Sequence, residues 1–384
     1  MSNLSSPRLA RRGLLQFGIG AMVAVTGCLA AFSALADDRE SDYRRLNVAL
    51  VAHHVIPRYE RLADVTDQLA VTAGEVCAAT DQPGIDALQA GYHESLDAWM
   101  GVQHIRFGPI ELFLRSSRFA FWPDPRNTAG KQLGELIAAR DRSAIIHQAF
   151  IRGSVAVQGF PALERLLFGD GAVDALLASG EEAVYRCDLI AAIAENLKTM
   201  AADIVRDWRG GDVAYAEIVG HPGEENPYYH NGKEATLDLF QSLHAGMEIV
   251  ADRKLAPPLG ESAEDARPRL AESWRSERSL RNIRLNLVAA QQLYLGEGGF
   301  GFSAFLREVA GDPELDDLLR RAFDQTLATA RGIDVPLDVA ITDPAQRPAV
   351  ERLAIETKAL KQLIGDRLAA AIDIPMGFNS LDGD

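Results

Sequence analysis

The sequence predicts an all-helical protein made of two unequal helical halves. Apolar residues recur at steps of three or four along most of the chain, and this spacing places them on one face of an α-helix. The clearest such stripe consists of Ile190, Ile193, Leu197, Met200, Ile204 and Trp208. Asp312-Pro313 and Asp343-Pro344 each put a capping acid before a proline, which is typical of a helix start. The alternation that predicts strands is nowhere sustained.

The helices follow one another along the chain with one long interruption. Besides the stripe after Gly180 and a last stripe from Val350 to Ile364, we expect helices at about 41–79, 84–105, 131–140, 143–168, 232–253, 273–295, 302–310 and 313–331. Glycine and proline pairs gather between Gly210 and Gly232 without a long apolar stripe. This segment predicts a boundary between an N-terminal half, residues 37–212, and a C-terminal half, residues 213–384.

The N-terminus predicts export from the cytoplasm. Three arginines precede an apolar run from Leu14 to Val25, and the small residues at 34–36 suit a signal peptidase. We therefore expect residues 1–36 to be a signal peptide and the mature protein to work in the periplasm. Arg11-Arg12 partly matches a twin-arginine signal. Val25-Thr26-Gly27-Cys28 fits the lipobox pattern of bacterial lipoproteins. The alternative is therefore that Cys28 is lipidated and the protein is an outer-membrane lipoprotein.

The amino-acid composition argues against some classes of binding partner. Residues 1–36 contain three of the 39 basic residues and none of the 54 acidic ones, which leaves the mature chain with a net charge of −18. Nucleic-acid binding through a basic face is therefore not expected. A transmembrane span is not expected in the mature chain either, because no later segment is long and apolar enough. Only Cys77 and Cys187 follow the signal peptide, and in an oxidising compartment they are expected to form a disulfide. Two free thiols are the alternative.

Residues that could bind a metal occur only as scattered pairs. His93 and Asp97 stand where a zinc peptidase motif would have two histidines, and His244 and Glu248 share a helix face at the i, i+4 spacing. His93, His244, Glu248 and Glu164 are the candidate ligands, with ordinary surface pairs as the alternative. His53-His54 and the histidines between His221 and His230 are interpreted as polar linker, with capture of a transition metal as the alternative. P-loop, GxSxG and CxxCH motifs are missing.

Four separated motifs resemble the imelysin family. They are Arg106-Phe107-Gly108-Pro109, Phe121-Trp122-Pro123-Asp124, the run from Gln158 to Phe168, and the C-terminal run from Gly377 to Asp384. The resemblance extends over the mature chain. It implies two four-helix-bundle-like halves packed together, a periplasmic or outer-membrane location and an association with iron acquisition. It also implies a site built on a GxHxxE motif.

This chain departs from that motif at its histidine. Gly159 and Glu164 match the motif, whereas Pro161 stands in place of the histidine. Proline offers neither a nitrogen ligand nor a base that titrates near neutral pH. Metallopeptidase action through this motif is therefore not expected. Glu164 has two interpretations, an anchor for a cationic group or a buried structural carboxylate.

The leading hypothesis is an imelysin-like periplasmic protein that binds a ligand, a metal or a partner in a cleft between its halves. Iron, haem, another divalent metal and an envelope uptake protein are the expected ligands or partners. The candidate binding residues are Arg106, Trp122, Asp124, Glu164, Asn379, Asp382 and Asp384. A metallopeptidase that uses other histidines and a non-catalytic envelope adaptor are the alternatives.

Overall fold

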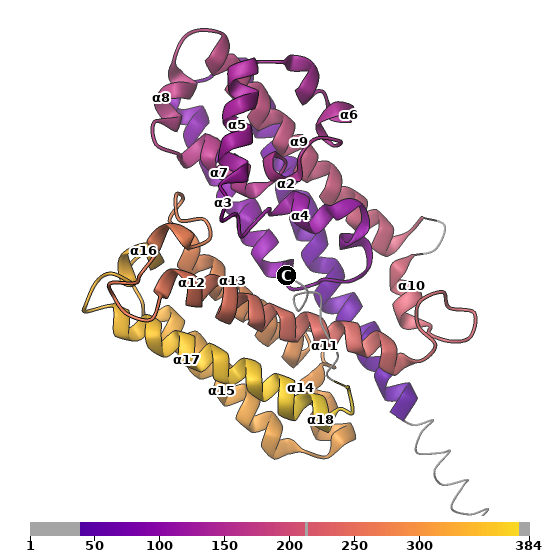
Figure 1. Ribbon diagram of the computed structural model, residues 1–384. Coiled ribbons are helices and arrows are strands. Elements are labelled where there is room, and N and C mark those ends of the chain that lie inside the picture. The colour runs from indigo at the N-terminus through magenta and orange to yellow at the C-terminus, as the bar shows by residue number, and fades with distance from the viewer. Residues whose placement is uncertain (1–38, 212–213, 376–384) are drawn as a thin grey trace, which may run out of the picture.

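The computed structural model describes residues 39–211 and 214–375, and these residues are helical with no strand among them. The helices form two bundles that meet at an angle (Figure 1). The expected all-helical fold is therefore confirmed. The signal peptide, Cys28, Asn379, Asp382 and Asp384 lie outside the described residues. No helix within the described ranges is both long and apolar enough to cross a membrane.

The first bundle is built around three long helices. They are α2 (Ile56–Ala78), α3 (Gln82–Val102) and α9 (Glu181–Arg209). Shorter helices cover one end, namely α4 (Arg115–Phe119), α5 (Thr128–Ala139), α6 (His147–Phe150), α7 (Phe160–Phe168) and α8 (Ala172–Leu177). The predicted stripe of α9, from Ile190 to Trp208, is buried in the core of this bundle.

The second bundle pairs four longer helices. They are α11 (Gly232–Glu248), α13 (Ser279–Leu295), α15 (Pro313–Arg331) and α17 (Arg347–Leu363). Short helices connect or extend them, namely α12 (Ala256–Leu259), α14 (Phe302–Phe305), α16 (Leu337–Ala340) and α18 (Ala369–Ala371). Asp312 caps α15 as predicted, because its side chain accepts a hydrogen bond from the amide of Leu315. The short α10 (Tyr215–Gly220) lies in the segment expected to be irregular.

The prediction of one continuous helix at residues 143–168 was wrong, because only its last part, Phe160–Phe168, is a regular α-helix of more than one turn. The chain there breaks into short turns of helix before α7 begins at Phe160. Gly159 explains the break, because its backbone packs so closely on another segment that an added Cβ would lie 2.2 Å from the carbonyl oxygens of Arg118 and Phe119. Only glycine permits this approach, and it fixes where α7 starts.

Two of the four π-helices among the described residues lie at corresponding places, each shortly before a proline. Residues 39–50 are helical and run through the π-helix η1 (Val51–Val55) into α2, and α11 runs through η6 (Ile249–Leu255) into α12. Each π-turn precedes a proline in the next turn, Pro57 or Pro257. A π-turn re-aims the side chains of the helix that contains it, and such turns are frequent at functional sites.

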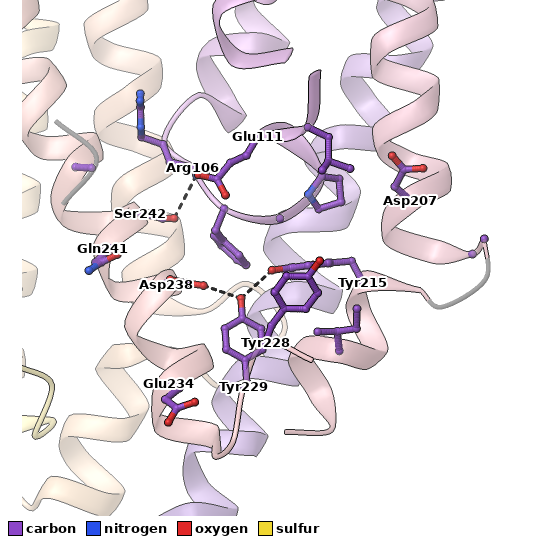
Figure 2. Close-up of a pocket in the computed structure, with 18 residues that line it drawn as sticks. Arg106, Glu111, Asp207, Tyr215, Tyr228, Tyr229, Glu234, Asp238, Gln241 and Ser242 are labelled. Atoms are coloured by element: carbon purple, nitrogen blue, oxygen red, sulfur yellow. Dashed lines mark hydrogen bonds between the residues drawn. The ribbon is translucent and has the colours of Figure 1, made fainter. Parts of the chain in front are cut away.

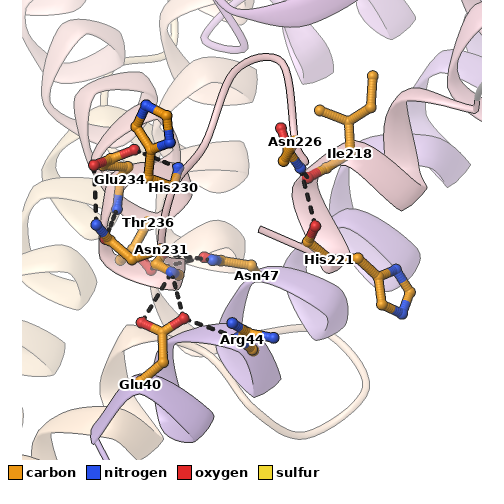
Figure 3. A network of polar contacts seen from close by, with 11 residues as sticks. Glu40, Arg44, Asn47, Ile218, His221, Asn226, His230, Asn231, Glu234 and Thr236 are labelled. Carbon is orange, nitrogen blue, oxygen red and sulfur yellow. Dashed lines mark hydrogen bonds and ion pairs between the residues drawn. The ribbon is translucent and has the colours of Figure 1, made fainter. Parts of the chain in front are cut away.

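The first helix reaches across to the second bundle (Figure 3). Glu40 accepts hydrogen bonds of 2.7 and 2.9 Å from the amide of Gly232, the first residue of α11. Asn47 donates to the carbonyl of Gly232 at 2.8 Å and accepts from the hydroxyl of Thr236 at 2.7 Å. The N-terminal end of α11 is therefore fixed by residues that lie almost 200 positions earlier in the chain.

A buried lysine lies where the bundles meet. Lys254 of η6 is 1 % exposed, and its ammonium pairs with Glu272 at 2.7 Å. The same ammonium donates to Asn286 of α13 at 2.6 Å and to Gln103, just after α3, at 2.9 Å. Burial lowers the pKa of Lys254, while the neighbouring Glu272 raises it. One cation therefore holds together segments of both bundles.

The predicted disulfide is confirmed. Cys77 at the end of α2 is bonded to Cys187 in α9, 110 residues later. Replacing both cysteines by alanine should lower the free energy of unfolding by about 2–4 kcal/mol, because the unfolded chain regains the freedom of a long loop. Urea denaturation measures the loss. A reductant should destabilise the wild type to the same extent and leave the double variant unchanged; equal stability of oxidised and reduced wild type would contradict this role.

Removing the buried lysine should destabilise the protein more than removing the whole pair. Lys254→Met leaves the carboxylate of Glu272 buried without its cation, which costs about 3–5 kcal/mol. In the double variant Lys254→Met/Glu272→Gln no unpaired charge remains, so its loss should be smaller than the sum of the two single losses. Urea denaturation of all four proteins gives the coupling energy. Additive losses would show that the two charges do not support each other.

Candidate functional site

The two bundles enclose a pocket of about 760 Å³, which we call the interbundle cleft. Its walls come from the first bundle at residues 96–170 and from the second at residues 252–275. Among the side chains that line it are Trp122, Asp124, Pro161, Glu164, Arg165, Asp252, Arg253, Arg269, Glu272, Trp274 and Arg275. Three of the predicted binding residues, Trp122, Asp124 and Glu164, therefore line one cavity.

Glu164 joins the two sides of this cleft. It lies in α7, is 4 % exposed, and accepts hydrogen bonds from the amide and the hydroxyl of Ser276 at 3.0 and 2.9 Å. Burial raises the pKa of Glu164, and the hydrogen bonds of Ser276 and the charges of Arg275 and Arg165 oppose this rise. Of the two interpretations of this carboxylate, the geometry supports a structural one, because one of its oxygens is already bound across the bundles.

The wall opposite Glu164 is a constrained loop between α12 and α13. Ser273 and Glu277 adopt left-handed backbone conformations with φ of 53° and 56°. Such conformations are unfavourable for residues other than glycine and persist where the surroundings hold them. Here the carbonyl of Ser273 accepts from the amide of Arg278 at 3.0 Å and from the hydroxyl of Ser276 at 3.2 Å. The loop thus presents Trp274 and Arg275 in a fixed position.

The loop of the first bundle that faces the cleft is also held in place. Asp124 accepts hydrogen bonds from the amides of Thr128 and Ala129 at 2.8 and 2.9 Å, so it stabilises the N-terminal end of α5. Trp122 precedes it and lines the cleft beside Phe121. Asp124 therefore has a structural role that accounts for its charge.

The donors around Glu164 do not fit a divalent metal. Pro161 lines the cleft where the family motif would place an imidazole, and the charged neighbours of Glu164 are the guanidinium groups of Arg165 and Arg275. A metal site needs about three or more donors, and neighbouring guanidinium charges oppose the binding of another cation. Across residues 39–211 and 214–375, no group of three or more His, Cys, Asp or Glu side chains is placed to hold a metal.

The other histidine candidates have different surroundings. His93 stacks on Phe168 with ring centroids 5.0 Å apart, and burial lowers its pKa to about 4. Asp97, one turn later, pairs with Arg278 and Arg281. His244 stacks on Phe240 at 6.5 Å, and neither it nor Glu248 belongs to a larger group of metal donors within the described part of the chain.

Arg106 lies in a second pocket of about 720 Å³, which we call the tyrosine pocket (Figure 2). This pocket shares no lining residue with the interbundle cleft. The backbone amide of Arg106 donates to the hydroxyl of Ser242 at 3.4 Å. Gly108, in the same motif, has a φ of +70°, and a Cβ on this residue would lie 2.6 Å from the ring of Tyr215. The motif at 106–109 therefore shapes a different pocket from the other predicted residues.

Three tyrosines and a carboxylate define the tyrosine pocket. The hydroxyls of Tyr215 and Tyr229 are 2.9 Å apart, and Tyr229 donates to Asp238 at 2.6 Å (Figure 2). Burial raises the pKa of Asp238 and raises that of Tyr215 to about 12. Tyr228 is 63 % exposed at the same pocket. The segment interpreted as polar linker thus contributes ordered walls, which its turn-rich composition did not indicate.

Two buried histidines contact each other between the bundles. The Nε2 atoms of His54, in η1, and His104, after α3, are 2.8 Å apart, so one ring donates to the other. Both side chains are almost fully buried, and their Nδ1 atoms have no hydrogen-bond partner. Burial lowers the pKa of both, that of His104 to about 3. Arg58 lowers both pKa values further, and Glu297 lies 3.7 Å from Nδ1 of His54.

Acid should therefore destabilise the protein through this pair. Below the ordinary histidine pKa of 6.5 the unfolded chain binds protons that the folded chain does not, so stability is lost as the pH falls from about 7 towards 5. Each histidine contributes about 1.4 kcal/mol per pH unit below its unfolded pKa. In urea denaturation the double variant His54→Asn/His104→Asn should lose the share of this slope that the pair contributes and keep the share of His93, whose pKa burial also lowers. His221→Gln, at an exposed histidine, should keep the whole slope. If the double variant kept the wild-type dependence of stability on pH, the two buried histidines would not be a cause of the acid sensitivity.

The chain was compared with known proteins by sequence and by fold. The family model for imelysin, peptidase family M75, matches residues 55–365. Iron-regulated protein A of Synechococcus elongatus is 23 % identical over 302 residues, which cover 77 % of each chain.

Two solved structures share the fold at 18 % identity. An imelysin-like protein from Psychrobacter arcticum has a TM-score of 0.70, covering 88 % of this chain and 98 % of its own. A protein described as an iron-regulated protein A precursor, from Parabacteroides distasonis, has a TM-score of 0.71. Its match covers 85 % of this chain and 94 % of the Parabacteroides chain. Because the family model spans most of the chain, including both walls of the interbundle cleft, this protein belongs to the imelysin family.

Proposed function

We propose that this protein is an exported ligand-binding protein that serves iron acquisition, and that its ligand binds in the interbundle cleft. The observation that carries the proposal is the cleft itself, a cavity of about 760 Å³ in which both bundles supply aromatic and charged side chains. Cavities of this size with an apolar lining and a few convergent polar groups are typical of small-molecule sites. The related iron-regulated protein A supports the link to iron.

The contacts across the cleft favour binding over a purely structural role. The bundles are already joined by the buried pairs at Glu164 and Lys254. Trp122 and Trp274 take no part in these two pairs, and both line the cavity while remaining partly exposed. Large aromatic side chains that line an open cavity are the residues that most often supply binding energy. The periplasm is the proposed location, with an outer-membrane lipoprotein as the alternative.

The proposal is tested by titrating the purified mature protein with ferric citrate, hemin and ferrous ion. Calorimetry should detect saturable binding of at least one of these iron-containing probes. The double variant Trp122→Ala/Trp274→Ala should weaken binding of the bound chelate about tenfold or more, because truncating a buried aromatic anchor removes about 2 kcal/mol or more. Failure of every iron probe to bind would reject the proposal.

A matched control separates the two pockets. Tyr228→Ala removes an aromatic ring that is 63 % exposed at the tyrosine pocket, so it should leave binding in the interbundle cleft unchanged. Circular dichroism of each variant checks that the helices persist. Loss of binding with Tyr228→Ala, but not with the tryptophan variant, would move the site to the tyrosine pocket and overturn the assignment to the cleft.

A further inference from the structure

The acidic side chains of the interbundle cleft are mostly engaged within the protein. Glu272 pairs with buried Lys254 at 2.7 Å, and Asp252 pairs with Lys361 at 2.5 Å. Asp124 accepts two amides of α5, and Glu164 accepts two hydrogen bonds from Ser276. A carboxylate with these partners has little remaining attraction for a cation. Asp170, the fifth acid that lines the cleft, is exposed.

Three of the four arginines that line the cleft are engaged far less. Arg269 and Arg275 lie over the ring of Trp274, with guanidinium carbons 5.5 and 4.3 Å from its centroid. Neither makes a hydrogen bond or ion pair at bonding distance with any residue in the described ranges. Arg165 donates to Asn127 at 2.6 Å, while its Nε is buried without a partner. The cleft thus presents guanidinium N–H groups that lack acceptors.

These arginines also repel one another. Burial lowers the pKa of Arg275, and the charges of Arg165 and Arg269 lower it further, against the opposing effect of Glu164 and Asp170. Positive groups that crowd together in a partly buried site are stabilised when an anion binds between them. The planar guanidinium matches a carboxylate with two parallel hydrogen bonds, and stacking on tryptophan orients it.

We propose that the ligand of the interbundle cleft is an anion that bears carboxylate groups, bound by Arg269, Arg275 and Arg165 with its apolar part against Trp274. This proposal rests on the proposed function, which it deepens by naming the class of ligand. Iron would then reach this protein as a carboxylate chelate or as haem, whose propionates are carboxylates, and not as a bare cation. The replacement of the motif histidine by Pro161 agrees with this chemistry.

The test compares anionic probes with a bare cation. Calorimetry measures the dissociation constants of citrate, ferric citrate, hemin and, without oxygen, ferrous ion. At least one carboxylate probe should bind, and Arg269→Gln/Arg275→Gln should weaken its binding about tenfold or more for each arginine that pairs with a carboxylate of the probe. Each single variant, Arg269→Gln or Arg275→Gln, has a charge-matched control in Arg331→Gln, which removes one positive charge at an exposed arginine outside the cleft and should change the affinity little. The affinity should also fall as salt is raised.

The outcomes separate this proposal from the proposed function. One outcome is that ferrous ion binds tightly, that Glu164→Gln abolishes this binding, and that no carboxylate probe binds. This outcome would overturn the proposal of an anionic ligand and would support an iron-binding cleft. Binding of citrate alone, weakened by the arginine variants, would support the anionic ligand and reject the link to iron. Carboxylate binding that the arginine variants leave unchanged would overturn the assignment of these residues.

Discussion

The buried ammonium of Lys254 is the constraint on which the arrangement of the two bundles depends. A cation that is 1 % exposed is costly unless several acceptors surround it, and here the acceptors come from Glu272, Asn286 and Gln103. Gln103 follows α3 of the first bundle, whereas the other two belong to the second. Sliding one bundle against the other would strip the lysine of an acceptor, so the network restricts their relative position.

This restriction extends directly into the interbundle cleft. Glu272, which pairs with Lys254, also accepts from Asn282 at 2.9 Å and begins the loop that carries Trp274 and Arg275. Near the other end of this loop, Ser276 donates two hydrogen bonds to Glu164 in the first bundle. This wall of the interbundle cleft is therefore held at both ends by buried carboxylates. A preorganised wall of this kind lowers the entropy that a ligand loses on binding.

The sequence was sufficient for the helices and the disulfide, because both follow from local spacing and from counting cysteines. It failed between residues 143 and 158, since the close packing of Gly159 on Arg118 and Phe119 is a tertiary fact. Glu164, Trp122 and Asp124 could be selected through motifs. Arg269 and Arg275 could not be selected, because the role that we propose for them depends on their stacking on Trp274. The contact between His54 and His104 could not be predicted either, because the two residues are 50 positions apart in the chain.

An arginine-rich cleft in a chain of net charge −15 is not a contradiction. The Debye length at physiological ionic strength is about 8 Å, so most surface carboxylates are screened from a ligand that has reached the cleft. Inside it, the arginines and the tryptophan act at short range with less water between them and the ligand. The acidic surface would slow the approach of an anion without weakening its final contacts. Local side-chain geometry, and not the overall charge, therefore determines which ligand this cleft can hold.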